Sequence, residues 1–216
     1  MDSLDRYPML RPHVGKRFHD RSEPSLLLVG ESHYLPPDSK VHLSADVWYE
    51  GDGSLLTERE VRWMNTIDII KEFVANNGRV KAHSIFRNSF KIINSLGPQH
   101  EHFTAVADDV AYCDFFLRPA ITGKSLRVTE QDITVANDIF ARHLEELRPT
   151  GIVFLSSLAA RCLRIDLQSN PFIRTAHPAS QWWNRKAKKY GGVSGKEVLA
   201  KYVESLSWPR AGASRR

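Results

Sequence analysis

The sequence predicts an α/β fold built around a four-stranded, mainly parallel sheet. Four apolar runs have the length of strands, and the first of them, SLLLVG, is continuous, as expected for a strand that is buried on both faces. Segments with helical spacing of apolar residues separate these runs, so the connections are crossovers and neighbouring strands run parallel. The expected strands span residues 25–30, 111–117, 151–156 and 172–176.

Capping residues mark where the helices begin. Thr57 with Glu60 three residues later forms a capping box, and the apolar spacing that follows continues until Gly78. Thr129 and Ser194 begin two later helices in the same way. The expected helices span residues 57–78, 84–96, 129–147, 158–163 and 194–206.

Length and composition fit a globular protein. The 216 residues suit one domain, which we place at residues 1–209, followed by a basic tail at residues 210–216 that is expected to be disordered. Apolar residues make up 42% of the chain and charged residues 25%, which is the profile of a folded protein rather than a disordered one. No run of eighteen apolar residues occurs, so no membrane-spanning helix is expected.

Cysteine content and the first residues indicate the compartment. Cys113 and Cys162 are the only cysteines, too few for a four-thiolate cluster. Residues 1–11 contain no apolar stretch of the kind found in a secretory signal. We therefore expect reduced thiols and a cytoplasmic protein.

Positive charge is concentrated at one end of the chain. The net charge is +5, but residues 182–216 carry nine Lys or Arg against two Glu, so the remainder is slightly acidic. A basic surface confined to one end is what binding to a polyanion requires. We interpret residues 185–189, which include Arg185 and Lys186, as a phosphate-facing loop, and residues 210–216 as a solvated tail.

Candidate functional residues follow three of the expected strands, at the edge where ligands of open parallel sheets lie. Gly30, Glu31, Ser32, His33 and Tyr34 come directly after the first strand. The glycine permits a sharp turn and a close approach of backbone to a ligand. Taken alone, this segment is equally compatible with a polar turn that leaves the sheet.

The second strand ends in Tyr112 and Asp114, which strand alternation places on one face of the sheet. An aspartate in an apolar run is costly to bury without a partner. Asp114 is therefore either a functional group or a structural carboxylate that pairs with Arg118 or caps a loop.

The fourth strand runs into a loop that combines histidine, proline and aromatic residues. His177 is followed by Pro178, which stiffens the loop and fixes where the histidine points. Ser180, Gln181 and Trp182 come next, ahead of the basic cluster. A lone histidine is usually a core or cap residue, but this setting favours a functional one.

Together these segments resemble the uracil-DNA glycosylase superfamily, most closely the branch that normally carries an iron–sulfur cluster. LLLVGESHY is similar to that branch's strand and Gly-Glu-x-Pro-Gly turn, AYCDFFLRPA to its strand that ends in Asn and leads to Arg-Pro, and TAHPASQWW to its closing His-Pro-Ser loop. WYEGDGSLL resembles the segment whose aromatic ring stacks on the extruded base, which points to Tyr49. The similarity covers residues 26–189, and the order and spacing of the motifs are more specific than any single motif.

The resemblance implies a three-layer α/β sandwich and a base-excision mechanism. The target nucleotide leaves the duplex and enters a pocket. His177 donates to the departing base, while Glu31, with His33, orients water and stabilises the cationic sugar. The other matched residues divide into a base-binding set (Gly30, Ser32, Tyr34, Tyr49 and Asp114) and a DNA-binding set (Ser180, Gln181, Trp182, Arg185 and Lys186).

The sequence departs from the family pattern at several of these positions. Cluster cysteines are absent, so no iron–sulfur cluster is expected. The sequence has no glycine-rich phosphate motif and no metal-ligand spacing, so no other cofactor and no metal are expected. Ser32 occupies the slot where other branches place a catalytic Asp or Asn, which leaves Glu31 as the only carboxylate of the motif. His33 replaces a proline, and Tyr34 stands where one branch uses tyrosine to keep out a bulky base substituent.

Asp114 replaces the asparagine that reads uracil in the family. An ionised Asp only accepts hydrogen bonds, whereas Asn both donates and accepts. Cytosine presents an amine where uracil has an oxygen. We therefore expect a modified or cytosine-type pyrimidine rather than plain uracil as the excised base, removed in DNA repair or in defence against foreign modified DNA.

Two other functions fit parts of the sequence. The Ser32 slot is compatible with a non-catalytic DNA-binding module of the same fold, and a small-molecule nucleosidase is a third reading. The basic, aromatic loop after His177 favours a polymer over a free nucleoside. We expect DNA as the partner, with no membrane and no obligatory protein partner.

Overall fold

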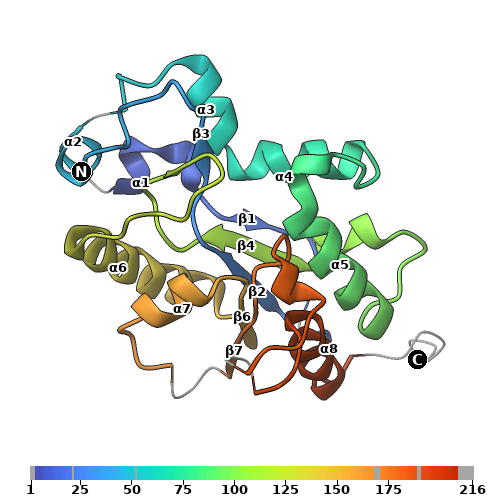
Figure 1. Ribbon diagram of the computed structural model, residues 1–216. Helices are drawn as coiled ribbons and strands as arrows, with labels where there is room; N and C mark the ends of the chain where they lie inside the picture. The colour runs from blue at the N-terminus through green and yellow to red at the C-terminus, as the bar shows by residue number, and fades with distance from the viewer. Residues whose placement is uncertain (1–2, 21, 52, 168–170, 189–190, 209–216) are drawn as a thin grey trace.

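The structure is a computed structural model that describes residues 3–20, 22–51, 53–167, 171–188 and 191–208 (Figure 1). The basic tail predicted at residues 210–216 and Lys189 of the basic cluster lie outside the described residues. The described part of the chain is an α/β fold in which helices cover both faces of a mostly parallel sheet, as the sequence predicts.

Five strands form the central sheet within the described residues. In spatial order they are β1 (His13–Val14), β4 (Val110–Asp114), β2 (Leu26–Gly30), β6 (Gly151–Phe154) and β7 (Phe172–Arg174). The four predicted strands are parallel to one another, and β1 pairs with β4 in the antiparallel sense. The predicted number of four was therefore wrong by one edge strand. A two-residue strand carries no alternation by which the sequence could indicate it.

The predicted helices are present, with one correction. The α-helices are α1 (Ser3–Arg6), α2 (Ala45–Glu50), α3 (Glu58–Met64), α4 (Thr66–Ala75), α5 (Ser84–Leu96), α6 (Glu130–Leu147), α7 (Ser157–Cys162) and α8 (Gly195–Ser205). The segment predicted as one helix up to Gly78 is divided into α3 and α4 at Asn65, whose side chain accepts the Asp68 N–H and caps α4. Capping boxes begin α3, α6 and α8, as predicted.

Short 3₁₀ helices complete the connections between these elements. They are η1 (Pro8–Leu10), η2 (Lys81–His83), η3 (Phe103–Asp108) and η4 (Gln181–Trp183). Two of them bear on the site described below, because η2 leads directly into α5 and η4 follows the loop after β7.

Alternate side chains of β2 belong to two different cores. Leu27 and Val29 pack on the face that α6 and α7 cover, together with Phe140 and Ala159. Leu26 and Leu28 pack on the opposite face, which α4, α5 and α8 cover (Figure 1). Both faces of the sheet are therefore buried at β2, which explains why this strand has a continuous apolar sequence.

A third core lies beside the carboxyl ends of β2 and β4. Tyr7 stacks on the fully buried Trp48 of α2, with ring centroids 4.3 Å apart. Met64 of α3 and Leu35 belong to the same core. This core holds α3 against the segment that follows β2, and so places α3 next to the strand ends.

The segments that leave β2 and β4 continue side by side beyond the sheet. They form a small parallel sheet of β3 (Tyr34–Leu35) and β5 (Ala120–Ile121). The backbone of Phe116 donates to the carbonyl of Glu31 at 2.9 Å, and that of Ala120 donates to the carbonyl of His33 at 2.8 Å. These bonds fix the course of residues 31–35, which carry much of the candidate site.

Among the described residues, no helix combines the length and apolar composition that crossing a bilayer requires.

Candidate functional site

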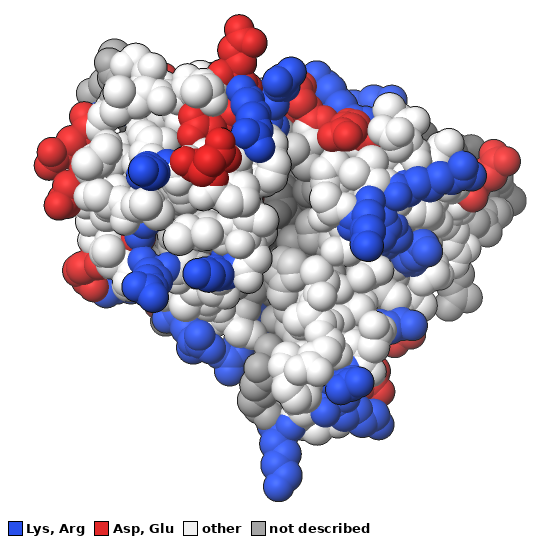
Figure 2. Space-filling model, turned by 45° about the horizontal axis from the view of Figure 1, so that its top comes forward, with Lys and Arg blue, Asp and Glu red and all other residues white. Residues whose placement is uncertain are grey.

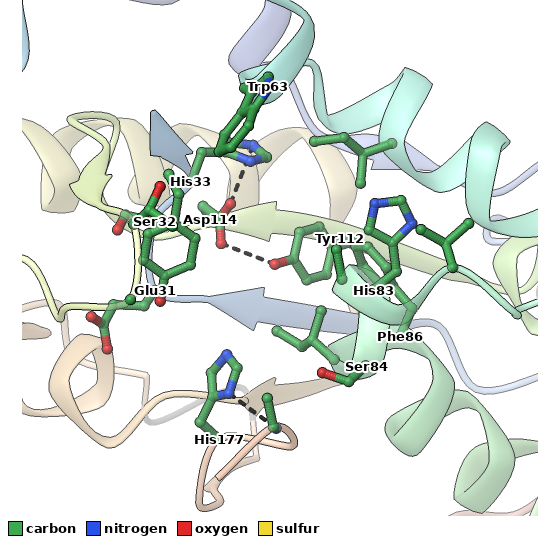
Figure 3. A pocket seen from close by; sticks show the side chains of 18 of the residues that line it. Glu31, Ser32, His33, Trp63, His83, Ser84, Phe86, Tyr112, Asp114 and His177 are labelled. Atoms are coloured by element: carbon green, nitrogen blue, oxygen red, sulfur yellow. Dashed lines mark hydrogen bonds and ion pairs between the residues drawn. The ribbon is translucent and has the colours of Figure 1, made fainter. Parts of the chain in front are cut away.

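A cavity of about 930 Å³ opens at the carboxyl ends of β2 and β4. The molecule is hollowed at the centre of one face, with Lys and Arg side chains on both sides of the hollow (Figure 2). The polar groups from the strand ends line one wall, and His83 and Phe86 from η2 and α5 line the opposite one (Figure 3). The predicted residues in the lining are Glu31, Ser32, His33, Tyr34, Asp114, His177 and Ser180.

Gly30 is required by close packing at the end of β2. It pairs with Asp114 across the sheet. A Cβ at position 30 would lie 2.0 Å from Asp114 Oδ1 and 2.2 Å from the Tyr112 hydroxyl. Only glycine leaves room for the hydrogen bond between these two side chains, so the reason for the glycine is a side-chain contact rather than an unusual φ angle.

Asp114 faces the cavity and lies between the Tyr112 hydroxyl and the His33 ring. The Tyr112 hydroxyl donates to Asp114 Oδ1 at 2.9 Å, and His33 Nε2 lies 3.2 Å from Oδ2 and 2.9 Å from the Thr66 hydroxyl. Burial and then the nearby Asp114 raise the pKa of Tyr112, which keeps its hydroxyl protonated. Burial lowers the pKa of His33, although Asp114 opposes the effect, and this lowering favours the neutral imidazole.

The alternative partner considered for Asp114 pairs elsewhere. Arg118 donates to Asp132 through two nitrogens, and the closer contact is 2.6 Å. Asp114 therefore keeps lone pairs that no cation of the described residues occupies, and it presents them to the cavity.

His177 is oriented by the turn that follows it. The backbone N–H of Ala179 donates to His177 Nδ1 at 3.1 Å, and that of Ser180 donates to the His177 carbonyl at 2.8 Å. Burial lowers the pKa of His177, although Glu31 and Asp114 oppose the effect. Because Nδ1 accepts a hydrogen bond, the neutral ring carries its proton on Nε2. Figure 3 shows the ring directed into the cavity, where Nε2–H is a donor.

Asn88 of α5 is a contributor that sequence reasoning missed. Its side-chain amide donates to the carbonyl of Pro178 at 2.8 Å and ties the histidine loop to α5. The contact joins residues 90 positions apart. No local pattern in the sequence could indicate it.

Glu31 lies at the edge of the cavity, with each carboxylate oxygen near one donor. Ser156 donates its hydroxyl to Oε2 at 2.7 Å, and the backbone N–H of Leu126 lies 3.4 Å from Oε1. These donors come from the segments before α7 and α6, so three parts of the chain meet at this carboxylate.

Two hydroxyl groups of the cavity wall lack a protein partner among the described residues. The side-chain oxygens of Ser32 and Ser180 are buried and make no hydrogen bond there. Buried polar groups in folded proteins are nearly always satisfied. Both residues line the cavity, so these hydroxyls offer hydrogen bonds to a bound ligand.

The aromatic surface of the cavity differs from the one predicted. Tyr49 does not line it, because Tyr49 is buried in the third core and its hydroxyl donates to Asp132 at 2.9 Å. Trp63 of α3 and Tyr34 do line the cavity, and their side chains are 39% and 40% exposed. The sequence signal for this surface was the position of Trp63, which lies outside the apolar spacing of its helix and was therefore not expected in the core.

The predicted DNA-binding loop lies next to the cavity along the chain, but only Ser180 of its five residues lines it. Gln181 accepts a hydrogen bond from Arg185 at 3.1 Å, and Lys186 lies 3.8 Å from Glu197. Trp182 is partly buried, while its neighbour Trp183 is part of the core. The basic residues that do line the cavity, Arg62 and Lys124, were not predicted.

No cluster of three or more His, Cys, Asp or Glu side chains in the described part of the chain is arranged to hold a metal ion. Comparison of the sequence with protein-family models gave no match, and comparison with curated proteins gave none either.

Proposed function

We propose that this protein is a DNA glycosylase that flips a modified or cytosine-type pyrimidine out of DNA and hydrolyses its N-glycosidic bond. The observation that carries the proposal is the neutral His177, whose Nε2–H is directed into a cavity that also contains Glu31 and Asp114. The similarity of the strand-end motifs to the uracil-DNA glycosylase superfamily supports the same conclusion.

His177 supplies the donor for the departing base. When the bond between base and sugar breaks, the base leaves with the electron pair and becomes anionic. The Nε2–H of a neutral imidazole donates a hydrogen bond to that charge. The ring needs no change of protonation state at neutral pH to do so. The turn that orients the ring and the contact from Asn88 hold the donor in place before the substrate arrives.

Glu31 is the group that acts on the sugar. A carboxylate near the cationic sugar stabilises it and accepts a hydrogen bond from the attacking water. Glu31 and His177 line the same cavity, so both groups can act on one nucleotide. His33 is engaged with Asp114 and Thr66, which makes it a positioning residue for Asp114 rather than a second base.

Asp114 reads the base in this proposal. The Tyr112 hydroxyl uses one of the roughly four acceptor positions of its carboxylate, and His33 Nε2 lies 3.2 Å from the other oxygen. A remaining one can accept from an exocyclic amine, which a cytosine-type base presents and uracil does not. The exposed rings of Trp63 and Tyr34 offer the stacking surface that was expected at Tyr49.

Basic side chains near the cavity would contact the phosphates that flank the flipped nucleotide. Arg62 and Lys124 are in the lining, and Arg185 and Lys186 lie on the exposed loop that follows Ser180. Such contacts provide affinity that does not depend on sequence. Gln181 and Trp182 lie at the start of this loop and are the candidates to fill the gap left by the flipped base.

The test is single-turnover excision from duplexes that contain uracil, cytosine or modified cytosines, read as alkali-labile abasic sites. His177→Ala and Glu31→Gln should each lower the rate by about 10²- to 10⁴-fold while DNA affinity changes little. His19→Ala is the matched control, because His19 is exposed and outside the cavity lining. DNA binding without release of any base would indicate a non-catalytic DNA-binding module instead.

A further inference from the structure

Ser156 joins a helix terminus to the carboxylate that acts on the sugar. It is the N-cap of α7, and its Oγ accepts the backbone N–H groups of Leu158 and Ala159 at 3.1 and 3.3 Å. The same oxygen donates to Glu31 Oε2 at 2.7 Å. One hydroxyl therefore accepts from the helix and donates to Glu31.

The helix determines where the hydroxyl proton points. A serine hydroxyl has one proton and two lone pairs. The two N–H groups of α7 occupy the acceptor side of Ser156, so its proton remains available for Glu31. Ser156 is only 2% exposed, so water offers little competition for that proton.

Sheet register brings the two residues together from distant parts of the sequence. Val29 of β2 is paired with Phe154 of β6. Two residues after this pair, the two strands reach the site at Glu31 and Ser156. A separation of 125 positions along the chain becomes a direct hydrogen bond.

We propose that Ser156 is a positioning residue that holds the Glu31 carboxylate in its working orientation. The proposal rests on the proposed glycosylase function. Without the serine donor, the 3.4 Å contact with the Leu126 N–H would be the one hydrogen bond from the described residues that constrains the carboxylate. Glu31 could then rotate away from the sugar, and the excision rate would fall although the fold is intact.

Ser156→Gly tests this because it removes the hydroxyl and, at an N-cap, affects helix stability by only a few tenths of a kcal/mol. We expect an excision rate roughly ten- to a hundredfold lower, the range for a lost hydrogen bond to a charged group. DNA affinity should be nearly unchanged. The ¹³C signal of the Glu31 side-chain carboxyl should shift, and Ser156→Thr should restore both the rate and the signal.

Ser194→Ala is the matched control. Ser194 is also a buried N-cap serine whose hydroxyl donates to a carboxylate, that of Glu197, at 2.9 Å, but it lies outside the cavity lining. Its loss should lower thermal stability and leave the excision rate and the Glu31 signal unchanged.

Two results would overturn the proposal: a wild-type excision rate in Ser156→Gly, or an equal loss of rate in Ser194→Ala. If the wild-type protein released no base from any duplex, the proposed function would fail by itself. The ¹³C signal of the Glu31 carboxyl would then be the remaining test of positioning by Ser156. An unchanged signal in Ser156→Gly would rule that positioning out.

Discussion

Two aspartates, the fully buried Asp132 and the partly buried Asp114, are held in opposite ways by this fold. Asp132 accepts from two nitrogens of Arg118, from the Tyr49 hydroxyl and from the backbone and hydroxyl of Thr129. Burial by itself would raise the pKa of Asp132, but the bonds from Arg118 and Thr129 outweigh it, and the pKa is lowered. This carboxylate is fully buried and surrounded by donors.

Asp114 has no arginine or lysine partner in the described part of the chain. Its partners are a tyrosine hydroxyl and a neutral histidine, and its free lone pairs face the cavity. A saturated carboxylate with its own cation ties the scaffold together. One that is held by neutral groups and left with acceptor capacity can bind a ligand. The comparison suggests that acceptor capacity, more than burial, separates a functional carboxylate from a structural one.

The largest expected effect is on stability at Asp132. Asp132→Asn leaves Arg118 buried without a compensating charge, and breaking such a pair costs about 3–5 kcal/mol. Asp114→Asn keeps an acceptor for Tyr112 and leaves no cation unpaired, so its cost should be under about 1.5 kcal/mol. Urea unfolding of both variants measures the difference, and equal losses would contradict the comparison.

A change of base preference is the next largest effect, and it should appear only at Asp114. Asn donates where Asp accepts, so Asp114→Asn should favour uracil over an amine-bearing base relative to wild type. An unpaired buried polar group costs about 1–3 kcal/mol, which corresponds to roughly ten- to a hundredfold in relative excision rate. The measurement is paired single-turnover rates on the two duplexes. An unchanged ratio would make Asp114 structural.

The smallest effect concerns acid stability near His33. Burial lowers its pKa below the ordinary value of 6.5, and Asp114 limits that shift. The unfolded chain then binds more protons, so His33 contributes to stability above pH about 6.5, and this contribution declines as the pH falls. The decline cannot exceed about 1.4 kcal/mol per pH unit for one histidine.

Asp114→Asn should make that decline steeper, because the carboxylate that favours protonated His33 is lost. Unfolding free energies of wild type and variant between pH 7 and pH 5 measure the effect. His33→Gln should flatten the slope in both backgrounds. A parallel pH dependence of wild type and Asp114→Asn would show that the two side chains are not coupled.

Local signals explain what could be predicted. The capping boxes at Thr57, Thr129 and Ser194 and the continuous apolar run of β2 depend on residues only a few positions apart. Ligands of open parallel sheets lie at the carboxyl ends of the strands, and this rule placed Glu31 and His177 at one edge of the sheet. Both residues line the same cavity. The break at Asn65 was missed because apolar spacing continues across it, although Asn is itself a good N-cap residue.

Contacts between distant segments explain what could not be predicted. Tyr49 matched a sequence motif, but the stacking of its neighbour Trp48 on Tyr7 holds α2 in a core away from the cavity, and Trp63 lies in the lining instead. Whether Arg118 would pair with Asp114 or with another carboxylate was likewise open.

The sequence by itself determined the mostly parallel sheet, the starts of the capped helices and the strand ends that carry the polar residues, because periodicity, caps and turns act over a few residues. Only the tertiary structure decided which polar groups are saturated and which remain free: Asp132 enclosed by Arg118, Asp114 open to the cavity, and Glu31 held by Ser156. Hydrogen-bond partners are chosen by sheet register and packing across the whole chain, and no local pattern encodes them.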